Sequence, residues 1–294
     1  MYKSNKLQKM FSGEPTPTYI ICEVGINHNG SIDEALKLIE SASKSGVDAV
    51  KFQKRTLSEI YSKSILDYSN SAEWNFDYLI PLLKDVELSD DDYKVIRKKC
   101  NELELDLIIT PFDEVSAEFI ADLGITAFKI ASADMTNYSL IEKCSSYGLP
   151  IIISTGMWSR DEILKVVEHY KSKNITFALL HTQSTYPAPY ESLGLKFIKD
   201  LCEMTEIVGY SGHERGVFIP IAAVTMGCKI IEKHITNNKE QRGPDHKASM
   251  LPEEWSEMIH NIRMLEKSLG GDKLVNQAEK LNKEVFAKSA IAKT

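Results

Sequence analysis

The sequence predicts an α/β fold of the (β/α)8 TIM-barrel class, and three observations support this prediction. The chain has 294 residues, close to the ~250 residues that a single barrel of this kind occupies. Short apolar runs alternate with amphipathic segments along most of the chain, which is typical of parallel strands joined by helices. Eight such runs are present, each continuously apolar, which indicates strands that are buried on both faces.

The first elements show this pattern clearly. Residues 19–24 form an apolar run that predicts a strand, and the polar loop 25–30 follows it. Ser31 and Glu34 have the spacing of a capping box. The apolar residues after them recur on one helical face until Gly46, a plausible helix stop. Residues 49–53 form the second predicted strand, which completes one strand–helix–strand unit.

The same unit recurs along the rest of the chain. The remaining predicted strands are 107–110, 127–130, 151–154, 177–180, 207–210 and 229–232. Helical patterns that begin at Ser89 and Ser159 lie between them, and a long final helix covers 255–269. An open doubly wound sheet is the alternative, but loop 25–30 is not the G-x-G-x-x-G turn that such a sheet usually carries. The connection 54–88 has no clear periodicity and is a candidate active-site lid.

Composition limits the class of protein. Hydrophobic residues make up 43% of the chain and charged residues 26%, as in a soluble globular domain with a sizeable core. The net charge of -7, without a basic run, gives no electrostatic footprint for nucleic acid or an anionic membrane. The five scattered cysteines favour reduced thiols in the cytoplasm over a disulfide framework.

The ends of the chain add to this prediction. The N-terminus is polar and lacks the apolar core of a signal peptide, and no run is long enough to span a membrane. We therefore expect a cytoplasmic protein. The predicted organisation is an N-terminal extension over 1–18, a catalytic barrel over 19–270 and a C-terminal segment over 271–294.

Polar side chains gather where the predicted strands end, which is where barrels of this class carry their active sites. Lys51 and Lys129 lie inside otherwise apolar strands. They either snorkel or pair with a glutamate as structural residues, or they surround a bound anion. Hydroxyl donors occupy matching positions, namely Thr110, Ser132, Ser154, Ser184 and Ser211. Cations combined with hydroxyls suit phosphate and carboxylate groups.

Two histidines form a second candidate site. His213 and His234 follow neighbouring strands, with Glu232 and Asp245 close by in the sequence. A structural role for each histidine is the alternative. Together, two imidazoles with oxygen ligands and water would suit Mn²⁺, Zn²⁺, Co²⁺ or Fe²⁺. Such an ion could polarise a carbonyl as a Lewis acid.

A series of short motifs runs through the chain in a fixed order. They are 23–30 (EVGINHNG), 50–53 (VKFQ), 110–112 (TPF), 129–132 (KIAS), 154–157 (STGM), 186–187 (YP), 209–214 (GYSGHE), 232–234 (EKH) and 243–249 (GPDHKAS). In order and spacing they resemble the sialic acid synthase family, over roughly residues 18 to 290. The resemblance implies a barrel that condenses phosphoenolpyruvate with an N-acetylated hexosamine, usually N-acetylmannosamine, to a nine-carbon 2-keto acid and phosphate.

The resemblance also implies roles for individual residues. Phosphoenolpyruvate would be held by Lys51, Thr110, Lys129, Ser132, Ser154, Ser184 and Ser211. The sugar would be faced by Glu23, Gln53, Tyr186, Asp245 and Phe286. His213 and His234 would hold Mn²⁺, with Mg²⁺ or Co²⁺ as alternatives. The catalytic set would be Glu23, Asp134, Lys51 and Lys129, with Glu23 handling the water or sugar proton.

Three expectations remain open at this point. Family members usually continue into an antifreeze-like domain that caps the site of the partner in a homodimer, and this chain ends about where that domain would begin. The acceptor could be N-acetylmannosamine, its 6-phosphate or a dideoxy-diacetamido hexose. The alternative functions are an aldolase that works through a lysine Schiff base and a sugar-binding barrel without catalysis.

Overall fold

The strands close into a parallel barrel, as the sequence predicts. The computed structural model describes residues 6–67 and 76–288. Its strands pair in sequence order, and β1 pairs with β8 to close the ring. They are β1 (Tyr19–Gly25), β2 (Ala49–Lys54), β3 (Asp106–Pro111), β4 (Ala127–Ile130), β5 (Ile151–Ser154), β6 (Phe177–Thr182), β7 (Val208–Gly212) and β8 (Ile230–His234). The open doubly wound alternative is therefore wrong.

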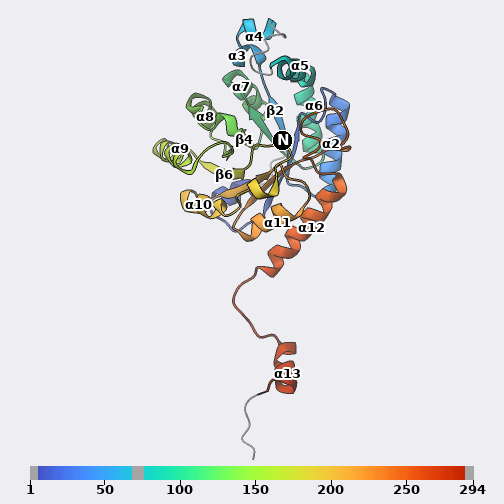
Figure 1. The fold of residues 1–294 in the computed structure, drawn as a ribbon, viewed down its shortest axis with the longest axis vertical. Helices are drawn as coiled ribbons and strands as arrows, with labels where there is room; N and C mark the ends of the chain where they lie inside the picture. The colour runs from blue at the N-terminus through green and yellow to red at the C-terminus, as the bar shows by residue number, and fades with distance from the viewer. Residues whose placement is uncertain (1–5, 68–75, 289–294) are drawn as a thin grey trace, which may run out of the picture.

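An outer ring of helices surrounds the strands (Figure 1). Its members are α2 (Ile32–Ser45), α6 (Asp90–Glu102), α7 (Glu114–Leu123), α8 (Tyr138–Ser145), α9 (Arg160–Ser172), α10 (Phe197–Met204), α11 (Phe218–Thr225) and α12 (Pro252–Ser268). The Ser31 hydroxyl caps α2 by accepting the Glu34 N–H, and Gly46 ends that helix in the left-handed conformation at φ 83°. The predicted start and stop of α2 are thus confirmed, and the Glu34 side chain pairs with Lys37 instead of completing the capping box.

The connection after β2 is not one irregular loop. It contains α3 (Leu57–Ile60), α4 (Lys63–Asp67) and α5 (Phe76–Val86), which lie beyond the end of β2 in Figure 1. Residues 68–75 of this predicted lid lie outside the described part of the chain. The short helices escaped the sequence pattern because four or five residues are too few to show a helical period.

The N-terminal segment takes part in the barrel core. Helix α1 (Lys6–Phe11) buries Leu7 and Met10 against the inward-facing residues at the N-terminal ends of the strands. Lys6 Nζ lies 2.7 Å from Asp48 Oδ2 and donates to the Thr18 carbonyl at 3.1 Å. From residue 6 onward, the predicted extension therefore closes one end of the barrel.

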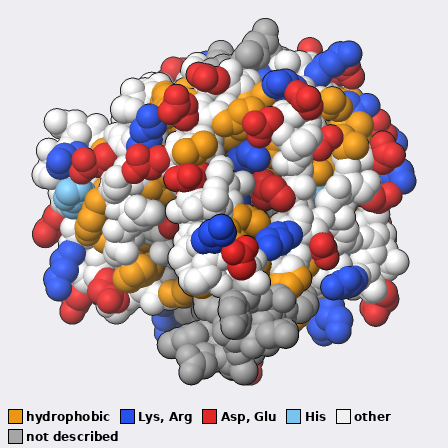
Figure 2. Space-filling model, turned by 90° about the horizontal axis from the view of Figure 1, so that it is seen from above, with side chains coloured by type: hydrophobic (Ala, Val, Ile, Leu, Met, Phe, Trp, Pro, Cys, Tyr) orange, Lys and Arg blue, Asp and Glu red, His pale blue; other side chains and the backbone are white. Residues whose placement is uncertain are grey.

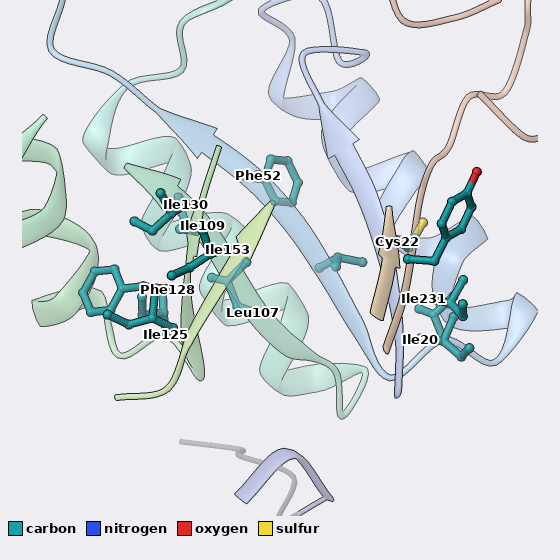
Figure 3. Packing of buried hydrophobic residues seen from close by; sticks show 14 of the residues in the cluster. Ile20, Cys22, Phe52, Leu107, Ile109, Ile125, Phe128, Ile130, Ile153 and Ile231 are labelled. Carbon is teal, nitrogen blue, oxygen red and sulfur yellow. The ribbon is translucent and has the colours of Figure 1, made fainter. Parts of the chain in front are cut away.

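Strand side chains alternate between two apolar layers. On β1, Ile20 and Cys22 face the helices, whereas Tyr19 and Ile21 face the barrel interior. Figure 3 shows the helix-facing layer, in which Ile20 and Cys22 lie in the same cluster as Ile231 of β8. The alternation means that the next inward position on β1 after Ile21 is a polar one.

The inward positions become polar at the carboxyl ends of the strands. Glu23 is paired in register with Lys51 on β2 and with His234 on β8. Ser211 on β7 is paired in register with Glu232 on β8. The barrel interior thus has an apolar lower part and a charged upper part, and the strand period decides which residues form each.

The C-terminal helix stands apart from the barrel. Helix α13 (Gln277–Phe286) is joined to α12 by the stretch 269–276 and projects away from the other elements in Figure 1. It buries none of its residues. Within residues 6–67 and 76–288, none of the helices combines the length and apolar character needed to cross a bilayer.

Charged side chains of both signs are interspersed on the outer surface. Figure 2 shows Lys and Arg next to Asp and Glu across the face that it presents. Among the described residues on that face, basic side chains do not form a broad continuous area.

Candidate active site

A cavity of about 230 Å³ opens at the carboxyl ends of the strands. It brings together most of the residues that the sequence nominates. They are Glu23, Lys51, Gln53, Thr110, Lys129, Ser132, Ser154, Ser184, Tyr186, Ser211, His213 and His234. A larger groove of about 380 Å³ lies beside Phe11 at the other end of the barrel, but none of the nominated residues lines it.

Lys51 lies at the centre of a buried charge cluster. Its Nζ is 2.9 Å from Glu23 Oε2 and 3.6 Å from Glu232 Oε1, and it donates to Thr110 Oγ1 at 3.4 Å. The Ser211 hydroxyl donates to Glu232 Oε1 at 3.0 Å. The structure therefore realises the pairing of a strand lysine with glutamates, and it keeps that lysine in the wall of the cavity.

The two carboxyl groups beside Lys51 differ in pKa. Burial raises the pKa of Glu23, although Lys51 opposes the shift. Burial also acts on Glu232, but Lys51 and Lys129 outweigh it and hold the pKa of Glu232 below its usual value. For Lys51, burial alone would lower the pKa, but the charges of Glu23 and Glu232 raise it. Glu232 therefore stays ionised, whereas Glu23 takes up a proton more readily.

Lys129 has a different environment from Lys51. Its Nζ donates to Ser154 Oγ at 2.6 Å and to the Ile130 carbonyl at 2.9 Å, so its close contacts are a hydroxyl and a carbonyl. Burial lowers the pKa of Lys129 to about 8, and the more distant charge of Glu232 only partly opposes this. Neither of these two close contacts carries a negative charge. An anion bound in the cavity would therefore supply a charge partner for Lys129.

Hydroxyl groups surround the backbone of Gly156 on the side of Lys129. The Gly156 N–H donates to Ser132 Oγ at 3.0 Å. A Cβ at Gly156 would lie 2.1 Å from Ser184 Oγ and 2.9 Å from Ser132 Oγ. A side chain at this position would displace one or both hydroxyls, so glycine allows them to converge on the cavity.

The two predicted metal-binding histidines lie close together, with their rings tilted by 49°. The ring centroids of His213 and His234 are 5.6 Å apart, and the Tyr186 ring lies 4.0 Å from that of His213. Burial, with the neighbouring His234, lowers the pKa of His213 to about 3, and burial also lowers the pKa of His234. Both imidazoles are therefore neutral at physiological pH, which is the form that binds a metal.

The hydrogen bonds of these rings leave nitrogen atoms for a ligand. His213 Nδ1 lies 2.7 Å from the Gln183 carbonyl, so that nitrogen carries the proton and Nε2 keeps a free electron pair. Buried His234 Nδ1 has no hydrogen-bond partner within the described residues. The described part of the chain contains no cluster of three or more His, Cys, Asp or Glu side chains that could hold a metal. Two protein nitrogens would therefore need water or substrate oxygens to complete a coordination sphere.

Two predicted acidic residues lie around the cavity but do not line it. Asp245 Oδ2 is 3.7 Å from His234 Nδ1, so this carboxyl group lies beside the histidine nitrogen that has no hydrogen-bond partner within the described residues. Asp134 belongs to the short helix η1 (Ser132–Asp134). Burial raises the pKa of each of these carboxyl groups. The predicted catalytic role of Asp134 has no contact in the cavity to support it.

The predicted sugar-facing residue Phe286 is not among the residues that line the cavity. It lies in α13, and its side chain is 71% exposed. The stretch 269–276 leads away from the barrel (Figure 1), and the sugar-facing role of Phe286 stays a prediction. The prediction depended on resemblance alone, with no strand position to fix the residue.

Two charged residues stand outside the set of site residues that the sequence predicts. The sequence places Glu232 beside the two histidines, and the structure places it in the cavity wall and in contact with Lys51. The strand period could have found it, because Glu232 shares the inward face of β8 with His234. Arg55 stacks on the Phe112 ring at 4.0 Å and donates to Gln53 Oε1, and Gln53 Nε2 in turn donates to Glu23 at 2.9 Å. No sequence signal pointed to Arg55, because it follows the end of β2 in the unpatterned connection.

Comparison with known proteins places these features in a family context. Residues 38–273 match the NeuB family. The N,N'-diacetyllegionaminic acid synthase of Legionella pneumophila is 38% identical over 268 residues, which cover 88% of this chain and 75% of that protein. The N-acetylneuraminate-9-phosphate synthase of Mus musculus is 35% identical over 286 residues, which cover 96% of this chain and 79% of that protein.

A solved structure shows the same architecture. The N-acetylneuraminic acid (sialic acid) synthetase of Leptospira borgpetersenii, in complex with citrate, superposes with a TM-score of 0.81 at 30% sequence identity. The superposition covers 92% of this chain and 91% of that one.

Proposed function

The chain belongs to the NeuB family of nonulosonic acid synthases, and from that premise we propose that it condenses phosphoenolpyruvate with an open-chain N-acetyl hexosamine. The products are a nine-carbon 2-keto acid and inorganic phosphate. One observation carries this proposal: two buried lysines and a set of converging hydroxyls share one cavity with two neutral histidines.

The lysine side of the cavity suits phosphoenolpyruvate. Lys51 and Lys129 supply the positive charge, and hydroxyl donors such as Ser132 and Ser184 supply directional hydrogen bonds to phosphate or carboxylate oxygens. The related Leptospira synthetase was crystallised with citrate, another small polyanion.

The histidine side suits a divalent ion that assists the acceptor. His213 and His234 would hold it, with Mn²⁺ as the first candidate and Mg²⁺ or Co²⁺ as alternatives. When bound, such an ion supplies Lewis acidity to an aldehyde oxygen. Tyr186, next to His213, and Gln53, next to Glu23, lie where they can contact the sugar.

The bond changes follow from this arrangement. Carbon 3 of phosphoenolpyruvate attacks the aldehyde carbon, and the aldehyde oxygen takes up a proton to become a hydroxyl. Water adds to carbon 2 and gives up one proton, which leaves a tetrahedral centre that carries a hydroxyl and the phosphate. The bond from carbon 2 to the phosphate oxygen then breaks, the hydroxyl proton passes to the departing phosphate, and the 2-keto group forms. Glu23 is the proposed proton acceptor from that water, because it has both the raised pKa and a position in the cavity wall.

A second candidate function has one observation in its favour. The lowered pKa of Lys129, about 8, is also what an aldolase needs in a lysine that forms a Schiff base. Borohydride added with substrate would trap that Schiff base and label Lys129. The proposed synthase reaction forms no covalent bond to the protein, so it predicts no labelling.

The decisive experiment measures phosphate release. Purified protein with phosphoenolpyruvate and Mn²⁺ is tested against N-acetylmannosamine, its 6-phosphate and a dideoxy-diacetamido hexose. We expect release that depends on one of these sugars and a nine-carbon product detected by mass spectrometry. If the protein binds at least one of the three sugars but releases phosphate with none of them, the result would support a sugar-binding barrel and refute the synthase.

A further inference from the structure

A buried polar cluster lies outside the cavity, on the helix-facing side of β7 and β8. We call it the outer triad; it consists of Tyr210, Glu214 and Lys233. Lys233 Nζ is 2.8 Å from Glu214 Oε1, and the Tyr210 hydroxyl donates to Glu214 Oε2 at 2.6 Å. The side chains of Glu214 and Lys233 are 0% exposed. No step of the proposed reaction uses these groups.

Each member of the outer triad is a chain neighbour of a residue in the cavity wall. Glu214 directly follows His213, and Lys233 directly precedes His234. Strand alternation sends Lys233 toward the helices while His234 faces the cavity. A constraint applied to the outer triad therefore acts on the backbone that carries both histidines.

The contacts tie the two strand ends together at several atoms. Lys233 Nζ donates to the backbone carbonyl of Glu214 as well as to its carboxylate. The His213 carbonyl accepts the Ala188 N–H at 3.0 Å, and the His213 ring contacts the Gln183 carbonyl. The segment that carries His213 is thus held both to β8 and to the loop after β6.

Gly212 shows how closely the chain fits around the outer triad. A Cβ at this position would lie 2.7 Å from Glu214 Oε2 and 2.7 Å from Tyr210 Cε1. Those atoms are closer than real Cβ contacts allow. Any other residue at 212 would displace the Glu214 carboxylate or the Tyr210 ring, so the triad and the glycine depend on each other.

A fully buried ion pair is a poor device for stability alone. Its desolvation often cancels its attraction, and apolar residues of similar size usually stabilise a fold as well or better. What the ion pair and its hydrogen bonds add is a fixed distance and direction between two chain segments. Replacing a residue that orients a metal-binding histidine commonly weakens metal affinity 10–100-fold.

We propose that the outer triad positions His213 and His234, whose ring centroids are 5.6 Å apart, so that both imidazoles reach one divalent ion. This inference rests on the metal site of the proposed function. Tyr210, Glu214 and Lys233 are positioning residues, since they act through the backbone of the histidines and touch neither ion nor substrate.

The test separates positioning from stability with two sets of variants. The double variant Glu214→Gln, Lys233→Met keeps the size of both side chains and leaves no buried charge without a partner. Tyr210→Phe removes one hydroxyl from the triad. Tyr19→Phe is its matched control, because the Tyr19 hydroxyl donates at 2.7 Å to the Asp106 carboxylate, at the opposite end of the barrel. Mn²⁺ affinity is measured by electron paramagnetic resonance of the free ion, with thermal melts alongside.

We expect the double variant to melt close to the unsubstituted protein but to bind Mn²⁺ roughly 10–100-fold more weakly. Tyr210→Phe should weaken Mn²⁺ binding at least threefold, whereas Tyr19→Phe should leave it unchanged even if the protein melts lower. Calorimetric titration of phosphoenolpyruvate without metal should give the same affinity in all four proteins, which shows that the cavity is intact.

Two results would overturn the inference in distinguishable ways. If the unsubstituted protein binds Mn²⁺ and all variants bind it equally well, the outer triad is structural and the metal site stands. If the unsubstituted protein does not bind Mn²⁺, the metal in the proposed function is wrong, and the positioning role is wrong with it.

Discussion

Replacing the two cavity lysines by methionine should separate their roles. Lys51→Met and Lys129→Met each remove one cation and keep a side chain of similar length. Both should weaken the binding of phosphoenolpyruvate, because each lysine would contact an anionic end of that ligand. Their effects on folding stability should be opposite, since Lys51 is paired with two glutamates and Lys129 contacts a hydroxyl and a carbonyl.

The magnitude for Lys129 follows from its pKa. Burial lowers that pKa from 10.5 to about 8, so holding the lysine charged in the folded protein costs ~3 kcal/mol at ~1.36 kcal/mol per pKa unit. This cost is fully present below pH 8 and disappears as the pH rises toward 10.5, where the unfolded chain also loses the proton. Lys129→Met should therefore raise the free energy of unfolding by up to ~3 kcal/mol at pH 7 and by only ~1 kcal/mol at pH 10.

Lys51→Met should act in the other direction. The pKa of Lys51 is raised by Glu23 and Glu232, so its charge contributes stability at every pH below its folded pKa. Removing it leaves two buried carboxyl groups without their shared partner, a loss of ~3–5 kcal/mol for a broken buried pair. The loss should shrink as the pH falls and the carboxyl groups become neutral.

The assay combines urea unfolding at pH 7 and pH 10 with calorimetric titration of phosphoenolpyruvate. For the ligand, we expect a loss of ~2–5 kcal/mol in either variant, the range for truncating one partner of a charge pair, or roughly 30- to 4,000-fold in Kd. A Lys129→Met protein that is less stable than the unsubstituted one at pH 7 would refute the reasoning about Lys129. Unchanged ligand affinity in both variants would place the anion site elsewhere.

Three further predictions address the other parts of the site. Glu23→Gln should lower kcat by a factor of roughly 10²–10⁴. In the unsubstituted protein, the rate should fall on the acidic side at a pH above the usual glutamate pKa, because burial raises the pKa of Glu23. The variant should not show this acidic fall in rate. Gly156→Ala should weaken phosphoenolpyruvate binding at least ~10-fold, because the new Cβ would lie 2.1 Å from Ser184 Oγ and would push that hydroxyl aside. Calorimetric titration measures this affinity, and an unaltered value would contradict the proposed hydroxyl site. Chelation should abolish phosphate release by the unsubstituted protein, and added Mn²⁺ should restore it. Mn²⁺ should not restore phosphate release in His213→Ala or His234→Ala, although both variants should melt near the temperature of the unsubstituted protein. Full Mn²⁺-dependent activity in either variant would contradict the histidine site.

The sequence by itself determined the barrel and the side of each strand that faces inward. Continuous apolar runs mark strands that are buried on both faces, and capping residues such as Ser31 mark where helices begin. Because strand side chains alternate with a period of two residues, Lys51 and Gln53 must share a face with each other and not with Phe52. The position of most cavity residues was therefore readable before any contact was known.

The tertiary structure decided which of these residues meet. Lys51 lies between Glu23 and Glu232 because barrel closure places β8 beside β1, and this neighbourhood joins residues that are more than 200 positions apart in the chain. Charge pairing depends on distances of a few ångströms, which cannot be read from a local sequence pattern. The opposite pKa shifts of Glu23 and Glu232 follow from this pairing. The separation of Phe286 from the cavity has the same origin, since a residue beyond the last strand has no sheet register to fix its place.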